Sequence, residues 1–383
     1  MKSNYIPIGQ LVEKVDERNL DGDITNLVGV SIDKCFIKSV ANTIGTDLTK
    51  YKIIKRKEFA VSLMQVSRDE KIPVAMQNDY DIAIMSPAYP IFRVADKSVI
   101  LPEYLDLWFK RTEFDREAAF IAVGGVRGSM PWEEFCRMKV FVPDIEKQRK
   151  IVKAYKTITD RIALKQRIND NLAETLLSLF SDVYNKINDD NDRIISLQEI
   201  CELTSSKRVF ADEYTNYGIP FYRGGEITLK QSGKPITDPL YISEQHYQEL
   251  KEKYGVPQLG DILLTAVGTI GNSYLVQNEK FYFKDGNIIW LKNFSNPDVN
   301  YYIYDYLKSH YFKMSLEGIC IGSTQTALTI AALSKLKVAI PINEELYMYS
   351  SKSKMIHNAI DKNNQEIERL HILQNILLSK LSR

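Results

Sequence analysis

Side chains that can contact DNA are gathered in a few short segments of this chain. Arginine, glutamine, asparagine and threonine recognise base edges in the major groove, whereas lysine and tyrosine hydroxyl groups hold phosphates. Tyrosines at strand spacing are also common packing residues, so a packing role stays open for them. On this chemistry the candidate DNA-contacting residues are Gln65, Arg68, Lys71, Tyr89, Arg127, Lys207, Arg208, Arg223, Thr265, Asn272, Thr324 and Gln325.

Catalytic and metal-binding motifs are not recognisable in the sequence. Ser86-Pro-Ala-Tyr89 lacks the second proline with which amino-methyltransferases hold a flipped base, and no glycine-rich cofactor loop precedes it. The acidic residues of Pro143–Lys147 are better explained by a helix start than by a nuclease metal site. Gly268-Thr-Ile-Gly271 does not have the spacing of a phosphate-binding loop. We therefore expect a binding protein with no catalytic residues, no metal and no cofactor of its own.

Composition and charge are those of an ordinary globular protein. The 383 residues are 44% hydrophobic, and 50 basic residues balance 49 acidic ones, so a nucleic-acid partner must be met by a local patch. The four cysteines and four histidines lie apart, which predicts neither a zinc site nor a disulfide framework. No apolar run is long enough for a membrane span. The expected location is the cytoplasm.

An internal repeat determines the expected architecture. Lys139-Val-Phe-Val-Pro143 returns as Lys337-Val-Ala-Ile-Pro341, an offset of 198 residues, and the same offset aligns Pro102–Lys110 with Asn300–Lys308. The start of the chain aligns more loosely, with Ile6–Leu11 resembling Ile195–Ile200. Two similar globular units are therefore expected.

Each copy ends in a segment with the heptad spacing of a coiled-coil helix. Units related by a pseudo-twofold axis place such helices antiparallel. Lys165, Asn169, Asn363 and Gln374 interrupt the apolar positions, as a solvated gap or, as we favour, as residues that fix register. The expected seam between the helices includes Ile158, Ile162, Leu172, Leu179, Ile360, Ile367, Leu370 and Leu377.

The predicted fold class is α+β, with two mixed domains joined by two long antiparallel coiled-coil helices. The expected strands are 51–55, 59–63, 81–85, 261–265 and 273–276, and the expected helices inside the domains are 101–114 and 301–313. The predicted divisions are a first mixed domain at 1–143, a central helix and linker at 144–190, a second mixed domain at 191–341 and a C-terminal helix at 342–383.

The combination of short motifs resembles the DNA specificity subunits of type I restriction-modification systems. The resemblance rests on Gly260–Thr265, Gly268–Gly271, Gly322–Gln325 and Leu336–Pro341, and in the first copy on Asp81–Tyr89, Gly125–Arg127 and Val140–Pro143. That family usually has Glu-Gln just after the proline. Here Glu146-Lys-Gln148 retains the glutamine and Asn343-Glu-Glu-Leu346 has lost it, so the two helix starts are expected to contact partners differently.

The resemblance implies a non-catalytic subunit with two target recognition domains. Each would recognise one half of a bipartite, asymmetric site in double-stranded DNA. The helix pair would set the spacing and dock two methyltransferase subunits, and a restriction subunit that translocates DNA can join them. S-adenosylmethionine, ATP and magnesium would belong to those partners. The alternatives are a protein-only scaffold that holds two identical partners and a diverged enzyme that modifies DNA alone.

Overall fold

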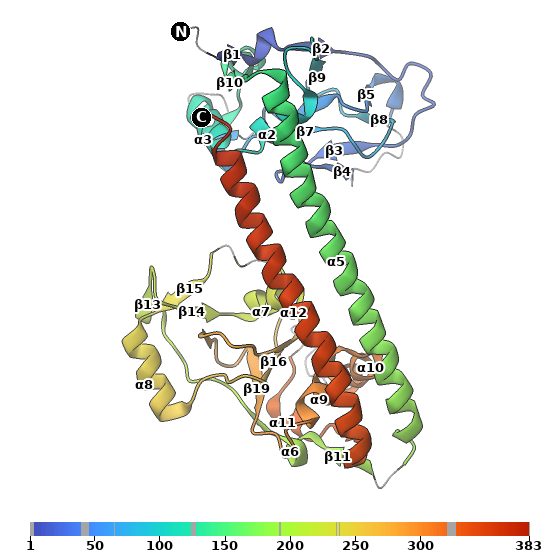
Figure 1. Ribbon diagram of the computed structural model, residues 1–383, viewed down its shortest axis with the longest axis vertical. Coiled ribbons are helices and arrows are strands. Elements are labelled where there is room, and N and C mark those ends of the chain that lie inside the picture. The colour runs from blue at the N-terminus through green and yellow to red at the C-terminus, as the bar shows by residue number, and fades with distance from the viewer. Residues whose placement is uncertain are drawn as a thin grey trace. The chain divides into compact units, whose positions relative to one another are not determined.

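The computed structural model describes residues 4–39, 46–64, 66–123, 128–190, 193–234, 236, 238–319 and 327–382. The chain forms two compact units, of which the first is built from two stretches of sequence and the second from one (Figure 1). The first comprises Met1–Ala163 with Arg369–Arg383, and the second comprises Leu164–Glu368. Within the described residues no helix combines the length and the apolar character needed to cross a membrane.

The first unit is a mixed α/β fold around a four-stranded antiparallel sheet with the order β2-β9-β6-β7. These strands are β2 (Val12–Val15), β9 (Ile91–Val94), β6 (Phe59–Val61) and β7 (Val74–Met76). Three strand pairs join β1 (Tyr5–Pro7) to β10 (Lys139–Phe141), β3 (Val28–Val30) to β4 (Phe36–Lys38) and β5 (Lys52–Lys55) to β8 (Ile82–Met85). The helices include α1 (Val66–Asp69), α2 (Pro102–Phe109), α3 (Thr112–Ala122) and α4 (Trp132–Arg137).

The second unit repeats this plan. Its sheet has the order β12-β19-β16-β17 and is antiparallel throughout. The strands are β12 (Glu202–Thr204), β19 (Ile288–Lys292), β16 (Ile262–Thr265) and β17 (Ser273–Leu275), with β11 (Ile194–Ser196) paired to β20 (Lys337–Ala339). The helices include α6 (Leu197–Ile200), α9 (Val299–Lys308), α10 (His310–Ile319) and α11 (Ile330–Ser334).

The second unit also has elements without a counterpart in this plan. A further sheet has the order β13-β15-β14-β18, with β13 (Tyr214–Thr215), β15 (Leu240–Ile242), β14 (Ile219–Tyr222) and β18 (Tyr282–Phe283). It is accompanied by α7 (Gly224–Gln231) and α8 (Glu244–Tyr254). Because β14 runs directly into α7, this sheet fixes where α7 meets the repeated part of the unit.

The repeat extends to individual hydrogen bonds. Tyr104 and Tyr302 are completely buried, and both lie on the helix that follows the sheet. The Tyr104 hydroxyl donates to the Phe141 carbonyl and the Tyr302 hydroxyl donates to the Ala339 carbonyl, each at 2.9 Å. In each unit, this bond ties the helix to the strand that leads into the long helix.

Both predicted domain helices are interrupted, so the prediction of single helices at 101–114 and 301–313 is wrong. In the first unit Arg111 has an extended backbone (ψ 138°) between α2 and α3. In the second, Ser309 has ψ 164° between α9 and α10, and its hydroxyl accepts from the backbone N–H of Phe312. A residue with extended backbone ends one helix, and a serine hydroxyl at that point caps the next. Arg111 and Ser309 are equivalent by the offset of the repeat.

Two long helices follow the repeated units. They are α5 (Ile145–Ile187) and α12 (Asn343–Ser379), and each continues from one unit into the other. In the second unit they run antiparallel, since Lys165 pairs with Glu366 at 2.9 Å while Phe180 meets the Tyr349 ring. Of the expected seam residues, Ile162, Ile367 and Leu370 are buried. The others are half-buried, namely Ile158, Leu172, Leu179, Ile360 and Leu377.

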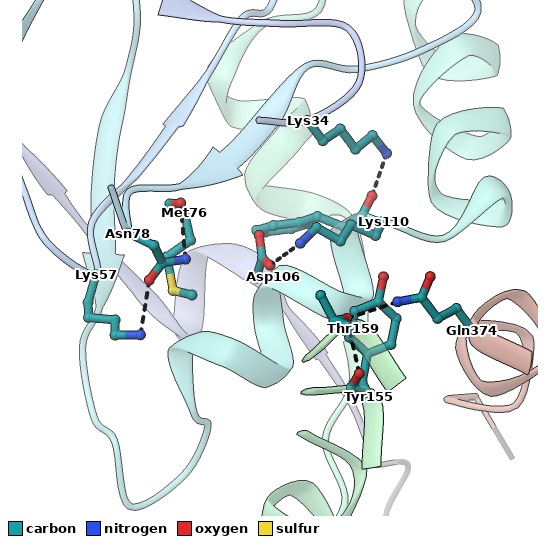
Figure 2. Close-up of polar contacts among 10 residues, drawn as sticks. Lys34, Lys57, Met76, Asn78, Asp106, Lys110, Tyr155, Thr159 and Gln374 are labelled. Carbon is teal, nitrogen blue, oxygen red and sulfur yellow. Dashed lines mark hydrogen bonds and ion pairs between the residues drawn. The ribbon is translucent and has the colours of Figure 1, made fainter. Parts of the chain in front are cut away.

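The polar residues of the seam are hydrogen-bonded to each other. In the second unit Lys165 donates to Asn363, and Asn169 and Asn363 also bond, each at 2.8 Å. In the first unit the Gln374 amide donates to the Thr159 hydroxyl at 2.8 Å, as Figure 2 shows. Such pairs are satisfied only in one alignment of the helices, which favours a role in register over a solvated gap.

Candidate nucleic-acid interface

A closed turn follows β16 in the second unit. The Thr265 and Asn272 backbones bond at 2.9 Å, and the Thr265 hydroxyl accepts from the Asn272 N–H at 3.0 Å and donates to the Thr269 carbonyl. Gly268 and Gly271 have φ values of 78° and 88°, which favour glycine. The Thr265 side chain is completely buried. Its hydroxyl is used to hold the turn, and a contact of Thr265 with DNA stays a prediction.

Helix α7 lies against this turn. The Thr228 hydroxyl accepts from the Asn272 amide at 3.0 Å and lies 3.1 Å from the Thr269 hydroxyl. Thr269 is exposed and Asn272 is half-buried. The structure thus brings predicted residue Asn272 together with Thr228 and Thr269, which were not among the candidates. Thr228 gave no signal in the sequence because no helix was expected there.

Arg223 stands at the start of α7 with its side chain 47% exposed. Its guanidinium pairs with the Glu226 carboxylate at 2.6 Å. Burial alone would raise the pKa of Glu226, but the hydrogen bonds from Arg223 lower this pKa below its ordinary value. The carboxylate is therefore ionised near neutral pH. It fixes the arginine beside the turn and offsets part of its charge.

The chain re-enters the interface at the same place in both units. The Leu328 N–H donates to the Ala266 carbonyl at 2.9 Å, and the Met130 N–H donates to the Leu63 carbonyl at 2.8 Å. The predicted contacts Gln65, Arg127, Thr324 and Gln325 lie outside the described residues.

The other candidates of the first unit lie on or near α1 and in the turn before β9. Arg68 is exposed and forms a two-point ion pair with Asp69, its neighbour in sequence, at 2.7 and 3.1 Å. Lys71 is exposed, and Tyr89 is half-buried in the turn between β8 and β9. Ser67 lies against Gly128, whose φ of 70° suits the chain's return toward Met130.

Lys207 and Arg208 lie beside the additional sheet. Arg208 pairs with Asp285 at 2.9 Å, and the Lys207 ammonium stands 5.4 Å from the Tyr254 ring centre. Among the described residues, no hydrogen bond or ion pair joins either of them to Arg223 or Asn272. Both side chains are exposed, so they form a second basic group on this unit.

The first unit is fixed to the start of α5 by Gln148, whose side chain is completely buried. The Gln148 amide donates to the Val99 and Pro143 carbonyls at 2.9 and 2.8 Å and accepts from the Leu101 N–H at 2.9 Å. These bonds use both the amide N–H groups and the carbonyl oxygen of Gln148 within the first unit. The equivalent residue in the second copy is Leu346, which is buried in an apolar core.

The second unit is fixed to α12 by a buried polar network centred on Asp305. Tyr349, Ser353 and His357, all on α12, bond to the Asp305 carboxylate at 2.7, 2.6 and 2.6 Å. Burial and the adjacent carboxylate raise the pKa of Tyr349, so its hydroxyl keeps the proton that it donates. The equivalent residue of the first copy is Leu107, buried in an apolar core.

Metal sites were not expected from the sequence. In the part of the chain that the structure describes, histidine, cysteine, aspartate and glutamate form no group of three or more able to hold a metal ion. The described residues of the candidate interface in the second unit offer the hydroxyls of Thr228 and Thr269, the Asn272 amide and the Arg223 guanidinium. This chemistry suits recognition by hydrogen bonds.

Comparisons with known proteins agree with this architecture. Residues 190–378 match the type I restriction modification DNA specificity domain family. A Haemophilus influenzae protein described as a type I restriction enzyme specificity subunit is 28% identical over 234 residues, which are 57% of this chain and 55% of that relative. The match thus spans about half the length of the relative. The crystal structure of a type I system S subunit from M. genitalium matches with a TM-score of 0.58 and 16% identity, covering 98% of this chain and 95% of that one.

The duplicated α/β fold with two long helices is shared with that S subunit structure. Residues 190–378, close to half of the chain, are assigned to the type I restriction modification DNA specificity domain family.

Proposed function

We propose that the chain is the non-catalytic DNA-recognition subunit of a type I restriction-modification complex. Each unit would recognise one half of a bipartite, asymmetric target in double-stranded DNA. The observation that carries this proposal is the repeated return of the chain beside the equivalent strands, at Leu63 and Ala266. The two units thus share one fold but have different side chains at equivalent places, as recognition of a two-part target requires.

The long helices would set the distance between the half-sites and dock two methyltransferase subunits. Both helices have apolar side chains turned to solvent in the second unit, which supports a protein partner. The exposed residues are Leu164, Ile168 and Leu177 on α5 and Tyr347, Met348 and Met355 on α12. S-adenosylmethionine, ATP and magnesium would be bound by the partner subunits, among them a restriction subunit where one is present. The complex would act on DNA in the cytoplasm.

Domain exchange tests the division of labour between the units. Residues 1–143 are replaced by the corresponding segment of a family member with another target, and methylated sites are sequenced in cells that carry the matching methyltransferase. We expect one half-site to change while the other half and the gap stay the same. A change in both halves would contradict independent recognition.

The purified chain should transfer no methyl group by itself. Labelled S-adenosylmethionine and DNA are incubated with the chain, and incorporation is counted with and without the methyltransferase subunit. We expect incorporation only with that subunit, because no methyltransferase motif is present in the sequence. Transfer by the chain alone, with contaminating subunits excluded by mass spectrometry, would favour a diverged stand-alone enzyme. Partner binding without any DNA binding would favour the protein-only scaffold.

A further inference from the structure

A pocket of about 330 Å³ opens in the first unit next to the candidate interface. Its size lies at the lower end of the range of small-ligand sites, about 300 to 1,000 Å³. The lining comes from β3, from the segments beside β4, β5 and β6, and from the turn between β8 and β9. Among the lining residues are Gly29, Tyr51, Ser62, Met64, Ala88 and Tyr89.

Tyr89 forms a preset aromatic wall. Its N–H donates to the Ser86 carbonyl and its own carbonyl accepts from the Lys52 ammonium, both at 3.1 Å. The ring packs against a small apolar core that includes Val28 and Met85. Because the backbone and one side of the ring are held, the wall needs no reorganisation to receive a planar ligand.

Small side chains keep the pocket open, and hydroxyl groups give it polar character. A Cβ atom added at Gly29 would meet only the Tyr89 hydroxyl, at 4.0 Å. Among the described residues, the hydroxyls of Tyr51, Ser62 and Tyr89 have no hydrogen-bond partner. A hydroxyl can donate and accept, so these groups can pair with the edge of a heterocycle that rests on an aromatic ring.

The pocket is continuous with the candidate interface. Ser62 and Met64 line it, and they flank Leu63, whose carbonyl receives the chain returning at Met130. Met64 is 61% exposed at the rim. A ligand of this pocket is therefore expected to be part of the molecule that binds at the candidate interface.

We propose that this pocket receives one nucleobase, unstacked from the half-site that the first unit recognises. The inference rests on the proposed function, because DNA supplies the base. Proteins that take a base out of the helix stack it on aromatic side chains and hydrogen-bond its edge, and this pocket offers both interactions. The pocket would add a position-specific contact to groove recognition in one half of the target only.

Mismatched DNA tests the proposal, because an unpaired base is easier to extrude. The full chain in complex with its methyltransferase is titrated with duplexes that carry the target found by methylation sequencing. Each base pair of the first half-site is replaced by a mismatch in turn. We expect one position at which the mismatch tightens binding by about tenfold. Gly29→Leu, which fills the pocket, should abolish this gain, whereas Gly29→Ala, the matched control, should retain it.

A base extruded by the methyltransferase subunit does not depend on Gly29. Comparing Gly29→Leu with Gly29→Ala therefore separates a base held in this pocket from a base held by the methyltransferase. Ala88→Phe fills the pocket from another wall and repeats the test should Gly29→Leu fail to fold. A gain that survives both filled variants, or no gain at any position, would overturn the pocket assignment. The pocket assignment would also be overturned if a free nucleoside bound to the wild type and not to Gly29→Leu while no mismatch changed DNA binding. Failure of the proposed function differs from all of these, since the wild-type complex would then not prefer its target over unrelated DNA.

Discussion

Replacing Asp305 with alanine should destabilise the second unit by about 3 to 5 kcal/mol, the range for removing one partner of a buried charged group. Asp305 is 2% exposed, and its three partners are supplied by α12. The substitution leaves the Tyr349 and Ser353 hydroxyls and the His357 ring without their shared acceptor in a buried place. Unsatisfied buried donors account for most of the expected loss.

Urea unfolding and hydrogen exchange would measure this effect. Peptides from α9 and from the first half of α12 should exchange faster in Asp305→Ala, because the network joins these two helices. Glu368→Ala is the matched control, since it removes an exposed carboxylate from α12 and should change stability by no more than about 0.5 kcal/mol.

A combined variant separates unsatisfied donors from simple loss of packing. Asp305→Leu with Tyr349→Phe, Ser353→Ala and His357→Leu removes the acceptor and its donors together. Replacing both sides of a buried polar contact by apolar groups can be nearly neutral. We therefore expect this variant to be more stable than Asp305→Ala. Equal stability of Asp305→Ala and Glu368→Ala would show that the network contributes nothing.

The two copies hold their long helices by different chemistry. At each of two equivalent positions, one copy has a buried polar residue and the other has an apolar one. The first copy uses a buried polar residue at Gln148 and an apolar one at Leu107, whereas the second uses Leu346 and Asp305. The repeat could be predicted because equivalent strands and helices have similar short sequences, which can be matched segment by segment. The hydrogen bonds of Gln148 and Asp305 could not be predicted, because their partners are distant in sequence, as Val99 is from Gln148.

For the candidate interface, too, the features set by local sequence could be predicted, whereas contacts between distant residues could not. The strands on either side of the glycine turn were expected from local sequence, and β16 and β17 lie close to the predicted ranges. Thr265 was predicted as a DNA contact from its type and place at a strand end, and only the fold shows that its hydroxyl holds the turn. Thr228 was missed because it reaches the turn only through α7. For Arg68 and Arg223 the charge was evident from the sequence, whereas the carboxylates that pair with them required the fold.

Lengthening both long helices by one heptad should lengthen the preferred gap between half-sites by about three base pairs. Seven residues add about 10 Å of helix at about 1.5 Å per residue, and one base pair of DNA spans about 3.4 Å. The insertions would lie between Thr159 and Lys165 in α5 and between Glu366 and Gln374 in α12. This choice leaves the Thr159–Gln374 and Lys165–Glu366 contacts unbroken. A whole heptad also keeps the seam in register.

Methylation-site sequencing of cells with the lengthened subunit would give the new gap directly. Three base pairs also turn the DNA by roughly 100°, given about 10.5 pairs per turn, so we expect methylation at the longer gap to be slower than normal. Inserting the heptad into α5 alone shifts its residues relative to α12, and this control should abolish methylation. Each half-site should keep its bases, because the recognition units themselves are unchanged. An unchanged gap in the doubly lengthened subunit would show that the helices hold the units together without setting their spacing on DNA.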